Sequence, residues 1–253
     1  MSADLELSVL SQASDGRGHV SGFAVTDQMI VAIGGVSSEP TVFASSNAVD
    51  FVRRRTPKDL GLRDVLAVAD SLWACGEYGQ LAVSRDQGGS WKTIETNTEG
   101  CLYKLALGTD GALWVVGDDG YVARVLGPRV QRGDFETNTR LLAVHAGRDE
   151  IVVLGFDGQL RRWRDGRVTT VPCGATKPIT GLAITAKGTW IVVGDGGFIA
   201  RSPDGQWFSR ASSGVDADLE GIGSLPDGSF VAVGDRGQIL RTTDDGRTWR
   251  VIP

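Results

Sequence analysis

The chain has 253 residues, 41% of them hydrophobic and 23% charged, and a formal net charge of −5. This composition supports a folded core and excludes a disordered chain. The acidic balance argues against a broad nucleic-acid-binding surface. The start of the sequence lacks the pattern of a secretory signal, and no apolar run reaches the ~18 residues of a membrane helix. We therefore expect a cytoplasmic protein with no membrane span and no nucleic-acid partner.

A short apolar run that ends in glycine recurs six times along the chain. The distances between the first glycines of successive runs are 42, 41, 38, 39 and 40 residues. These glycines are Gly34, Gly76, Gly117, Gly155, Gly194 and Gly234. A repeat of about 40 residues is typical of stacked or circular repeat architectures. The tetrapeptide Glu-Thr-Asn-Thr, found at 95–98 and again at 136–139, supports the same period.

Each repeat contains four short apolar runs separated by glycine-rich turns. Such runs predict short strands a, b, c and d joined by hairpins. Four antiparallel strands at this period predict an all-β fold, a six-bladed β-propeller of four-stranded antiparallel blades. We expect one domain over residues 1–253, in which residues 1–18 form an N-terminal extension with a strand candidate at 4–11. The blades are expected at about 19–56, 61–96, 101–138, 139–173, 178–213 and 218–253.

Two of the turns between strands c and d share a Ser/Thr-x-Asp-x-Gly pattern that ends near a tryptophan, and a third has a shortened form. The second repeat has Ser84, Asp86, Gly88, Ser90 and Trp91, and the last has Thr242, Asp244, Gly246, Thr248 and Trp249. The fifth repeat has a shorter version, with Ser202, Asp204 and Trp207. An aspartate at the start of a tight turn accepts backbone N–H groups, and glycine permits a positive φ. We therefore interpret these residues as structural.

This pattern resembles the Asp-box of sialidase-type (BNR) repeats. The Gly-Asp-x-Gly turns that precede Arg201 and Arg241 resemble the photosystem II assembly or stability-factor-like propellers of bacteria. The first resemblance implies a glycan-binding or glycan-cleaving protein, and the second implies a scaffold that docks a client protein through arginines. Because unrelated functions share a fold, neither resemblance fixes the chemistry.

The turns between strands b and c carry acidic residues. In a four-stranded meander these turns share one end of the blade with the connections between blades. We therefore expect an acidic ring at this end, made of Glu77, Asp118, Asp119, Asp157, Asp195 and Asp235. The functional hypothesis is a site for a basic partner, or for Ca²⁺ held by carboxylate and backbone oxygens. The simpler interpretation is that aspartate only shapes the turn.

Arginines form a second recurring set. Four of them lie four residues after the second glycine of a b–c turn, and Arg236 lies within the last of these turns. The four are Arg124, Arg162, Arg201 and Arg241. We expect a structural ladder between blades, or a docking surface for a client. Two denser basic runs, Arg53–Arg55 and Arg161, Arg162 and Arg164, are expected on solvated outer edges.

The sequence predicts no metal centre and no cofactor beyond the Ca²⁺ hypothesis. The histidines, His19 and His145, are unclustered, and no metal-binding or phosphate-binding motif occurs. The leading hypothesis is a non-enzymatic protein-binding or assembly scaffold that acts through the b–c end of the blades. A glycan-binding or glycan-cleaving protein is the alternative, and a small hydrolase with its site at the channel mouth is the third.

Overall fold

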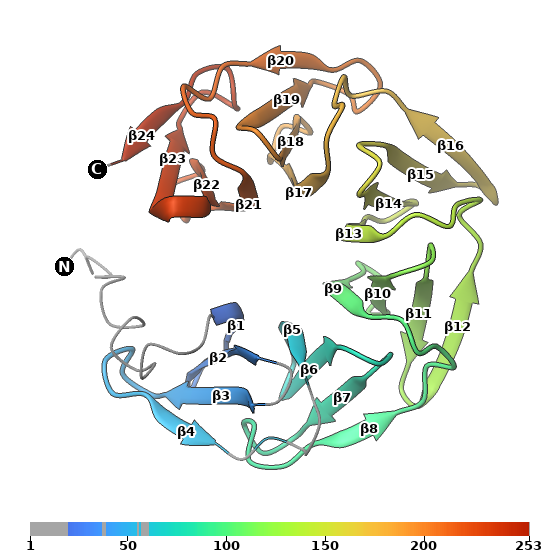
Figure 1. Cartoon of the computed structure of the whole chain (residues 1–253), viewed down its shortest axis with the longest axis vertical. Helices are drawn as coiled ribbons and strands as arrows, with labels where there is room; N and C mark the ends of the chain where they lie inside the picture. Colours follow the sequence, from blue (N-terminus) through green and yellow to red (C-terminus); the bar gives the residue numbers. More distant parts are fainter. Residues whose placement is uncertain (1–19, 37–38, 55, 57–60, 253) are drawn as a thin grey trace. The chain divides into compact units, whose positions relative to one another are not determined.

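The computed structural model describes residues 20–36, 39–54, 56 and 61–252. The predicted extension at 1–18, with its strand candidate at 4–11, lies outside these residues. The architecture is all-β, as predicted: six four-stranded antiparallel sheets, the blades of a six-bladed β-propeller (Figure 1). In each sheet the strands pair in chain order, so each is a simple meander.

The first strands of the six blades correspond to strand a. They are β1 (Val20–Val25), β5 (Leu62–Val68), β9 (Leu102–Leu107), β13 (Leu141–Ala146), β17 (Ile179–Ile184) and β21 (Leu219–Ser224). The second strands correspond to strand b. They are β2 (Ile30–Val36), β6 (Ser71–Gly76), β10 (Leu113–Gly117), β14 (Glu150–Gly155), β18 (Trp190–Gly194) and β22 (Phe230–Gly234).

The third strands correspond to strand c. They are β3 (Glu39–Ser45), β7 (Leu81–Ser84), β11 (Val122–Leu126), β15 (Leu160–Arg164), β19 (Phe198–Ser202) and β23 (Gln238–Thr242). The fourth strands correspond to strand d. They are β4 (Val52–Arg54), β8 (Lys92–Ile94), β12 (Arg129–Gly133), β16 (Arg167–Val171), β20 (Ser209–Ala211) and β24 (Arg250–Ile252). A 3-10 turn, η2 (Asp235–Gly237), joins β22 to β23.

The chain divides into two compact units. The first contains the described residues up to Leu105 together with Gly127–Val130, and the second contains Ala106–Leu126 and the described residues from Gln131 onward. In the first unit, apolar side chains of β1–β3 and of β5–β7 form one core cluster, which includes Val31, Val42 and Leu72. In the second unit, separate clusters lie between successive sheets, for example around Val153, Val192 and Leu240. Both faces of a sheet are buried against its neighbours, which explains why runs b and c are almost entirely apolar.

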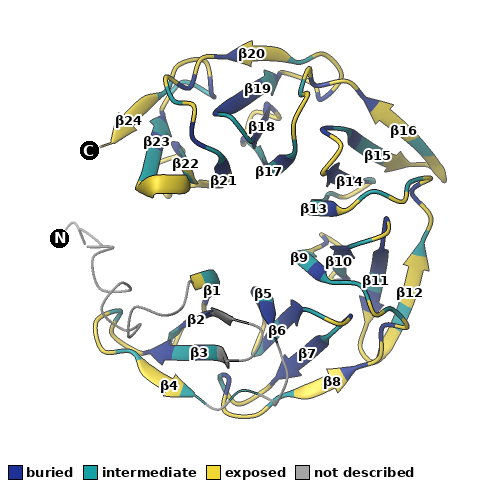
Figure 2. Cartoon of the chain, viewed as in Figure 1, coloured by how far each residue is buried: buried dark blue, intermediate teal, exposed yellow. Residues whose placement is uncertain are grey.

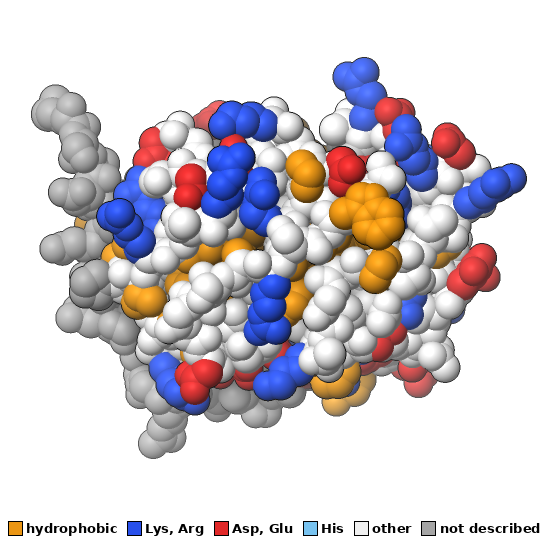
Figure 3. Space-filling view, turned by 90° about the horizontal axis from the view of Figure 1, so that it is seen from above, with side chains coloured by type: hydrophobic (Ala, Val, Ile, Leu, Met, Phe, Trp, Pro, Cys, Tyr) orange, Lys and Arg blue, Asp and Glu red, His pale blue; other side chains and the backbone are white. Residues whose placement is uncertain are grey.

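The fourth strands are the exposed edges of their sheets. Figure 2 shows them mostly as exposed, whereas the second strands are mostly buried. Arg53 and Arg54 lie on β4 and fit the predicted outer edge. The corresponding expectation for Arg161–Arg164 was wrong, because these residues lie on β15, which pairs with β14 on one side and β16 on the other. Acidic and basic side chains are intermixed over the face displayed in Figure 3.

A β-bulge recurs near the start of the first strand. The register between first and second strands shifts across one extra residue in five of the sheets, at Ser21, Arg63, Leu142, Thr180 and Glu220. A bulge re-aims the side chain of its extra residue. Ser21 and Thr180 use this position to donate to the backbone oxygens of Leu62 and Leu219 on the next sheet, while Arg63 and Glu220 place charges there.

Candidate functional site

In the second and fifth blades, backbone hydrogen bonds tie the b–c turn to the connections that enter its own blade and the next. In the second unit, Asp195 N donates to Pro178 O at 3.0 Å, and Gly197 N donates to Ala217 O at 2.8 Å. In the first unit, the corresponding donors are Glu77 N and Gly79 N, each 2.8 Å from its acceptor. We call this end of a blade the b–c end, and the opposite end the a–b end. The b–c end is thus a fixed framework, which lowers the entropy lost when it binds a partner.

The second glycine of these turns is required by two separate constraints. Gly197 has a φ of +65°, which is the left-handed region that favours glycine. A Cβ at this position would also lie directly on the carbonyl oxygen of Val215. Gly79 and Gly120 have the same two constraints, with the carbonyl oxygens of Thr98 and Thr137. These second glycines therefore mark where a turn packs onto the following connection, whereas the repeat-defining Gly194 packs onto Pro178 O of the preceding one.

Three of the predicted acidic residues are paired with arginines. Glu77 lies 2.7 Å from Arg63, Asp118 lies 2.8 Å from Arg140, and Asp157 lies 2.6 Å from Arg161. Their charges are therefore largely compensated within the chain. Asp119 is exposed in a turn position with a φ of +53°. The described turns thus do not carry a uniform acidic charge.

The two remaining turn aspartates belong to a carboxylate cluster at the b–c end of the last two blades. Asp195 and Asp235 share it with Asp218 and Glu220, and we call these four residues the acidic cluster. Partial burial and the charges of Asp218 and Asp235 raise the pKa of Asp195, and the charge of Lys177 opposes this rise. Burial and the three other carboxylates raise the pKa of Glu220. Each ionised carboxylate of the cluster thus disfavours the ionisation of its neighbours.

Sequence reasoning missed Asp218 and Glu220, although a signal was present. Glu220 is the extra residue of the β21 bulge, the position that Arg63 occupies at the bulge of β5. Arg63 compensates Glu77 of the same blade, whereas Glu220 adds to the charge of Asp235. In these two blades the bulge residue therefore decides whether the charge of the b–c turn is compensated or reinforced.

The raised pKa of Glu220 makes a pH-dependent stability difference testable. Because the carboxyl binds its proton more tightly in the folded chain, its ionisation destabilises the fold as the pH rises above about 4. Glu220→Gln should therefore raise the free energy of unfolding at pH 7 by about 0.5 kcal/mol, a value reduced by solvent screening. Urea unfolding at pH 4 and pH 7 measures this. The gain should disappear toward pH 4, and exposed Glu95→Gln should show no such trend.

The arginine set lies at the a–b end, away from the acidic b–c turns. Arg124 pairs with Asp110 at 2.6 Å and Arg241 pairs with Asp227, both in a–b turns of the same blade. Arg162 and Arg201 donate to backbone carbonyls of the following blade, at Gly205 and Asp245, and Arg162 also pairs with Glu150 of its own blade at 3.2 Å. Arg236 is at the b–c end, strongly exposed and 3.9 Å from Asp216. The structure therefore places the two predicted sets at opposite ends of the third strand.

The Ser84–Trp91 and Thr242–Trp249 turns have the same hydrogen-bond geometry. Asp86 Oδ1 accepts Ser90 N at 2.7 Å, and Asp244 Oδ1 accepts Thr248 N at 2.9 Å. Hydrogen bonds from Ser90 and Ser84 lower the pKa of Asp86 to about 2. Burial opposes the shift at Asp244, but hydrogen bonds from Thr248 and Thr242 lower its pKa to about 2 as well. Asp204, in the shorter turn, accepts Gln206 N at 2.9 Å, and Trp207 is exposed.

Among the residues that the structure describes, no three acidic, histidine or cysteine side chains are arranged to hold a metal ion. In the same part of the chain, no helix is long and apolar enough to cross a membrane.

The same fold occurs in proteins of different function. No family model and no curated protein matches the chain. A catalytically inactive H270A virginiamycin B lyase from Staphylococcus aureus, with quinupristin, matches with a TM-score of 0.80 at 11% identity over 95% of this chain and 86% of that chain.

Two structures of YCF48 also match. YCF48 bound to D1 peptide has a TM-score of 0.70 at 15% identity over 90% of this chain and 79% of that chain. YCF48 from Cyanidioschyzon merolae has a TM-score of 0.71 at 15% identity over 94% of this chain and 85% of that chain. At these identities the likeness shows the fold alone, which is that of a six-bladed β-propeller.

Proposed function

We propose that the chain is a non-enzymatic protein-binding or assembly scaffold that receives a basic segment of a client protein at the b–c end of its last two blades. The observation that carries this proposal is the acidic cluster. Its charges raise the pKa of Asp195 and of Glu220, so a client lysine or arginine would relieve the repulsion within the cluster. Complementary charge of this kind gives a partner both orientation and a fast association rate.

The surroundings of the acidic cluster suit a protein segment. A cavity of about 710 Å³ lies at the same end of the fifth blade, lined by Gly197, Arg210 and the connection 211–216. The backbone around it is held by the turn-to-connection hydrogen bonds. YCF48, whose fold this chain shares, has been seen with a D1 peptide bound, which supports a peptide-binding role for the fold but does not name this chain's client.

The proposal is tested by charge reversal at two exposed positions of the acidic cluster. The client is first isolated by affinity purification from the native host, and its affinity is then measured by calorimetry at two salt concentrations. Glu220→Lys with Asp235→Lys should weaken binding by about tenfold or more, and salt should weaken the native complex. The control is Asp70→Lys, a similar change at an exposed position in the turn between β5 and β6.

Unchanged affinity of the double variant would exclude the acidic cluster as the client site. Isolation of no client, together with binding to a glycan array, would favour the glycan-binding alternative instead.

A further inference from the structure

In the second unit, the c–d turn of one blade fills a groove beside the preceding blade. The Thr242–Trp249 turn of the last blade lies against β18, where a Cβ on Gly246 would be 2.8 Å from Ile191 Cδ1. The third-strand arginine of the preceding blade holds this turn, since Arg201 Nε donates to Asp245 O at 3.1 Å. Lys187, in the a–b turn of that blade, lies 2.9 Å from the Asp245 carboxylate.

The groove between the fourth and fifth blades is filled in the same way. Arg162 Nη2 donates to Gly205 O, in the c–d turn of the fifth blade, at 2.5 Å. The same guanidinium stacks on Trp190, 4.7 Å from the ring centre. Two successive grooves of this unit thus hold a turn of polypeptide whose carbonyl accepts from an arginine.

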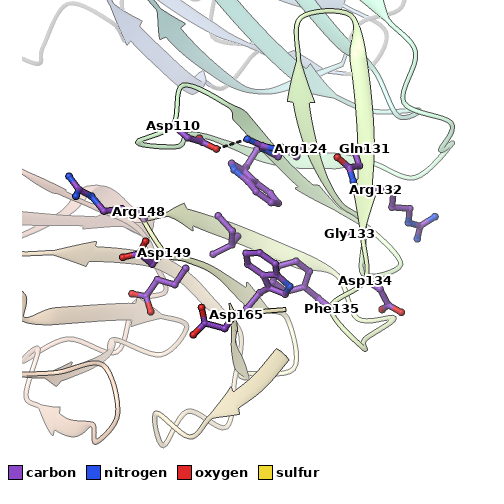
Figure 4. Close-up of a pocket in the computed structure, with 15 residues that line it drawn as sticks. Asp110, Arg124, Gln131, Arg132, Gly133, Asp134, Phe135, Arg148, Asp149 and Asp165 are labelled. Atoms are coloured by element: carbon purple, nitrogen blue, oxygen red, sulfur yellow. Dashed lines mark hydrogen bonds and ion pairs between the residues drawn. The ribbon is translucent and has the colours of Figure 1, made fainter. Parts of the chain in front are cut away.

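The groove between the third and fourth blades has no such turn. The hairpin between β15 and β16 turns through only Asp165 and Gly166, and a Cβ on Gly166 would meet nothing within 4 Å. A cavity of about 520 Å³ lies here instead, and we call it the β10–β15 groove. Figure 4 shows Asp110 and Arg124 on one side of it, and Asp149 and Asp165 on the other. Its volume is in the usual range of ligand sites.

Arg124 occupies the position that Arg162 and Arg201 occupy in the filled grooves. Its Nε is buried and has no hydrogen-bond acceptor among the described residues. In the filled groove between the fifth and sixth blades, the corresponding atom, Arg201 Nε, donates to Asp245 O. Arg124 Nη2 is paired with Asp110, but both side chains are partly exposed, so this pair is weak. The groove therefore keeps an Nε donor of the kind that binds a turn carbonyl between the fifth and sixth blades, where Arg201 supplies it.

The remaining lining adds aromatic surface and negative charge. Trp114 packs on the apolar cluster between β10 and β14, and Trp163, 36% exposed, lies on the facing strand β15. Asp110 stands at the a–b turn position that Lys187 holds in the last filled groove, as the matching turn hydrogen bonds show. Lys187 attracts the acidic Asp245 of the turn that fills its groove. Asp110, which is negatively charged, would instead attract a basic residue at the same place in a bound turn. An indole face also attracts such a cation.

We propose that the β10–β15 groove binds a turn-forming segment of a partner polypeptide, with a glycine at its tip and a basic residue before that glycine. A carbonyl of the segment accepts from Arg124, as Gly205 O and Asp245 O accept from the equivalent arginines. The basic side chain lies near Asp110 and the two indoles. This site is at the a–b end of the blades, so it is separate from the acidic cluster and does not depend on it.

The test uses a peptide with the sequence of the chain's own c–d turn. Residues 242–249, closed head to tail so that the turn is preformed, are synthesised with Asp245→Lys and with the native Asp245. Calorimetry with the full chain should show at least tenfold tighter binding for the Asp245→Lys peptide. Arg124→Gln should weaken that binding tenfold or more, and Trp163→Ala about fivefold. Thermal unfolding of each variant confirms that the fold is kept.

Arg241→Gln is the matched control, because Arg241 makes the same pair with an a–b turn aspartate in another blade. It should leave binding within twofold. The proposal is overturned if the Asp245→Lys peptide does not bind, if it binds no better than the native sequence, or if neither Arg124→Gln nor Trp163→Ala weakens it. The proposal is also overturned if neutral oligosaccharides displace the peptide and bind the chain more tightly than the peptide does. A saccharide would then be the ligand of the groove.

Discussion

Gly197→Ala is expected to lower the free energy of unfolding by about 3–4 kcal/mol. A left-handed φ costs an alanine about 1–2 kcal/mol, and an overpacked position adds about 1–3 kcal/mol. Both apply here, because Gly197 has a φ of +65° and its Cβ would overlap the carbonyl oxygen of Val215. The change would also disturb the hydrogen bond from Gly197 N to Ala217 O. Chemical denaturation followed by tryptophan fluorescence measures the loss.

Gly214→Ala separates the two causes. Gly214 lies in the same connection, has a φ of +75°, and a Cβ there would meet nothing within 4 Å. Gly214→Ala should therefore lower the free energy of unfolding only by the cost of the left-handed φ, about 1 kcal/mol. Equal losses in the two variants would show that the close approach of turn and connection does not contribute to stability.

Asp64→Ala is the second change for which we expect a large effect, about 3 kcal/mol of lost stability. Asp64 is only 5% exposed, yet it carries two contacts between neighbouring first strands of the first unit. Its Oδ1 accepts Lys104 Nζ at 2.9 Å and its Oδ2 accepts Leu105 N at 2.9 Å. Removal of the carboxylate leaves a buried backbone N–H without an acceptor and Lys104 without its partner.

Asp216→Ala provides the control for Asp64→Ala. Asp216 forms an ion pair with Arg236 in which both side chains are largely exposed, so its loss should change stability by less than about 0.5 kcal/mol. Urea unfolding of both variants at pH 7 gives the comparison. A loss below about 1 kcal/mol at Asp64 would mean that Leu105 N finds another acceptor and that the inter-strand contact is replaceable.

The period of the chain was sufficient to predict the fold. The glycine spacing, the four apolar runs and the turn signals determine the number of blades and the order of strands, because each is a local property of the backbone. The second glycines of three b–c turns have a structural role that the period alone does not reveal. Gly79, Gly120 and Gly197 each pack onto a carbonyl of the next connection, a contact between segments about 20 residues apart.

The candidate site was only partly predictable, because charge compensation is a matter of three-dimensional pairing. Glu77 and Asp195 have equivalent places in their turns, yet Arg63 compensates the first and Asp218 reinforces the charge of the second. The arginine set could have been placed better. Arg201 lies near the far end of a five-residue third strand, so it cannot share an end with the turn that precedes that strand.

The hydrogen bonds of Arg162 and Arg201 to the c–d turn of the following blade give assembly of the second unit a direction. Arg162 and Arg201 find their carbonyl acceptors only in residues 43 and 44 positions later. During synthesis from the N-terminus, a blade of this kind is completed only after the next has left the ribosome. The fourth blade supplies no such turn to Arg124, which pairs instead with Asp110, 14 residues earlier. The third blade is thus released from this dependence on its successor and can close its own arginine contact as soon as it is made.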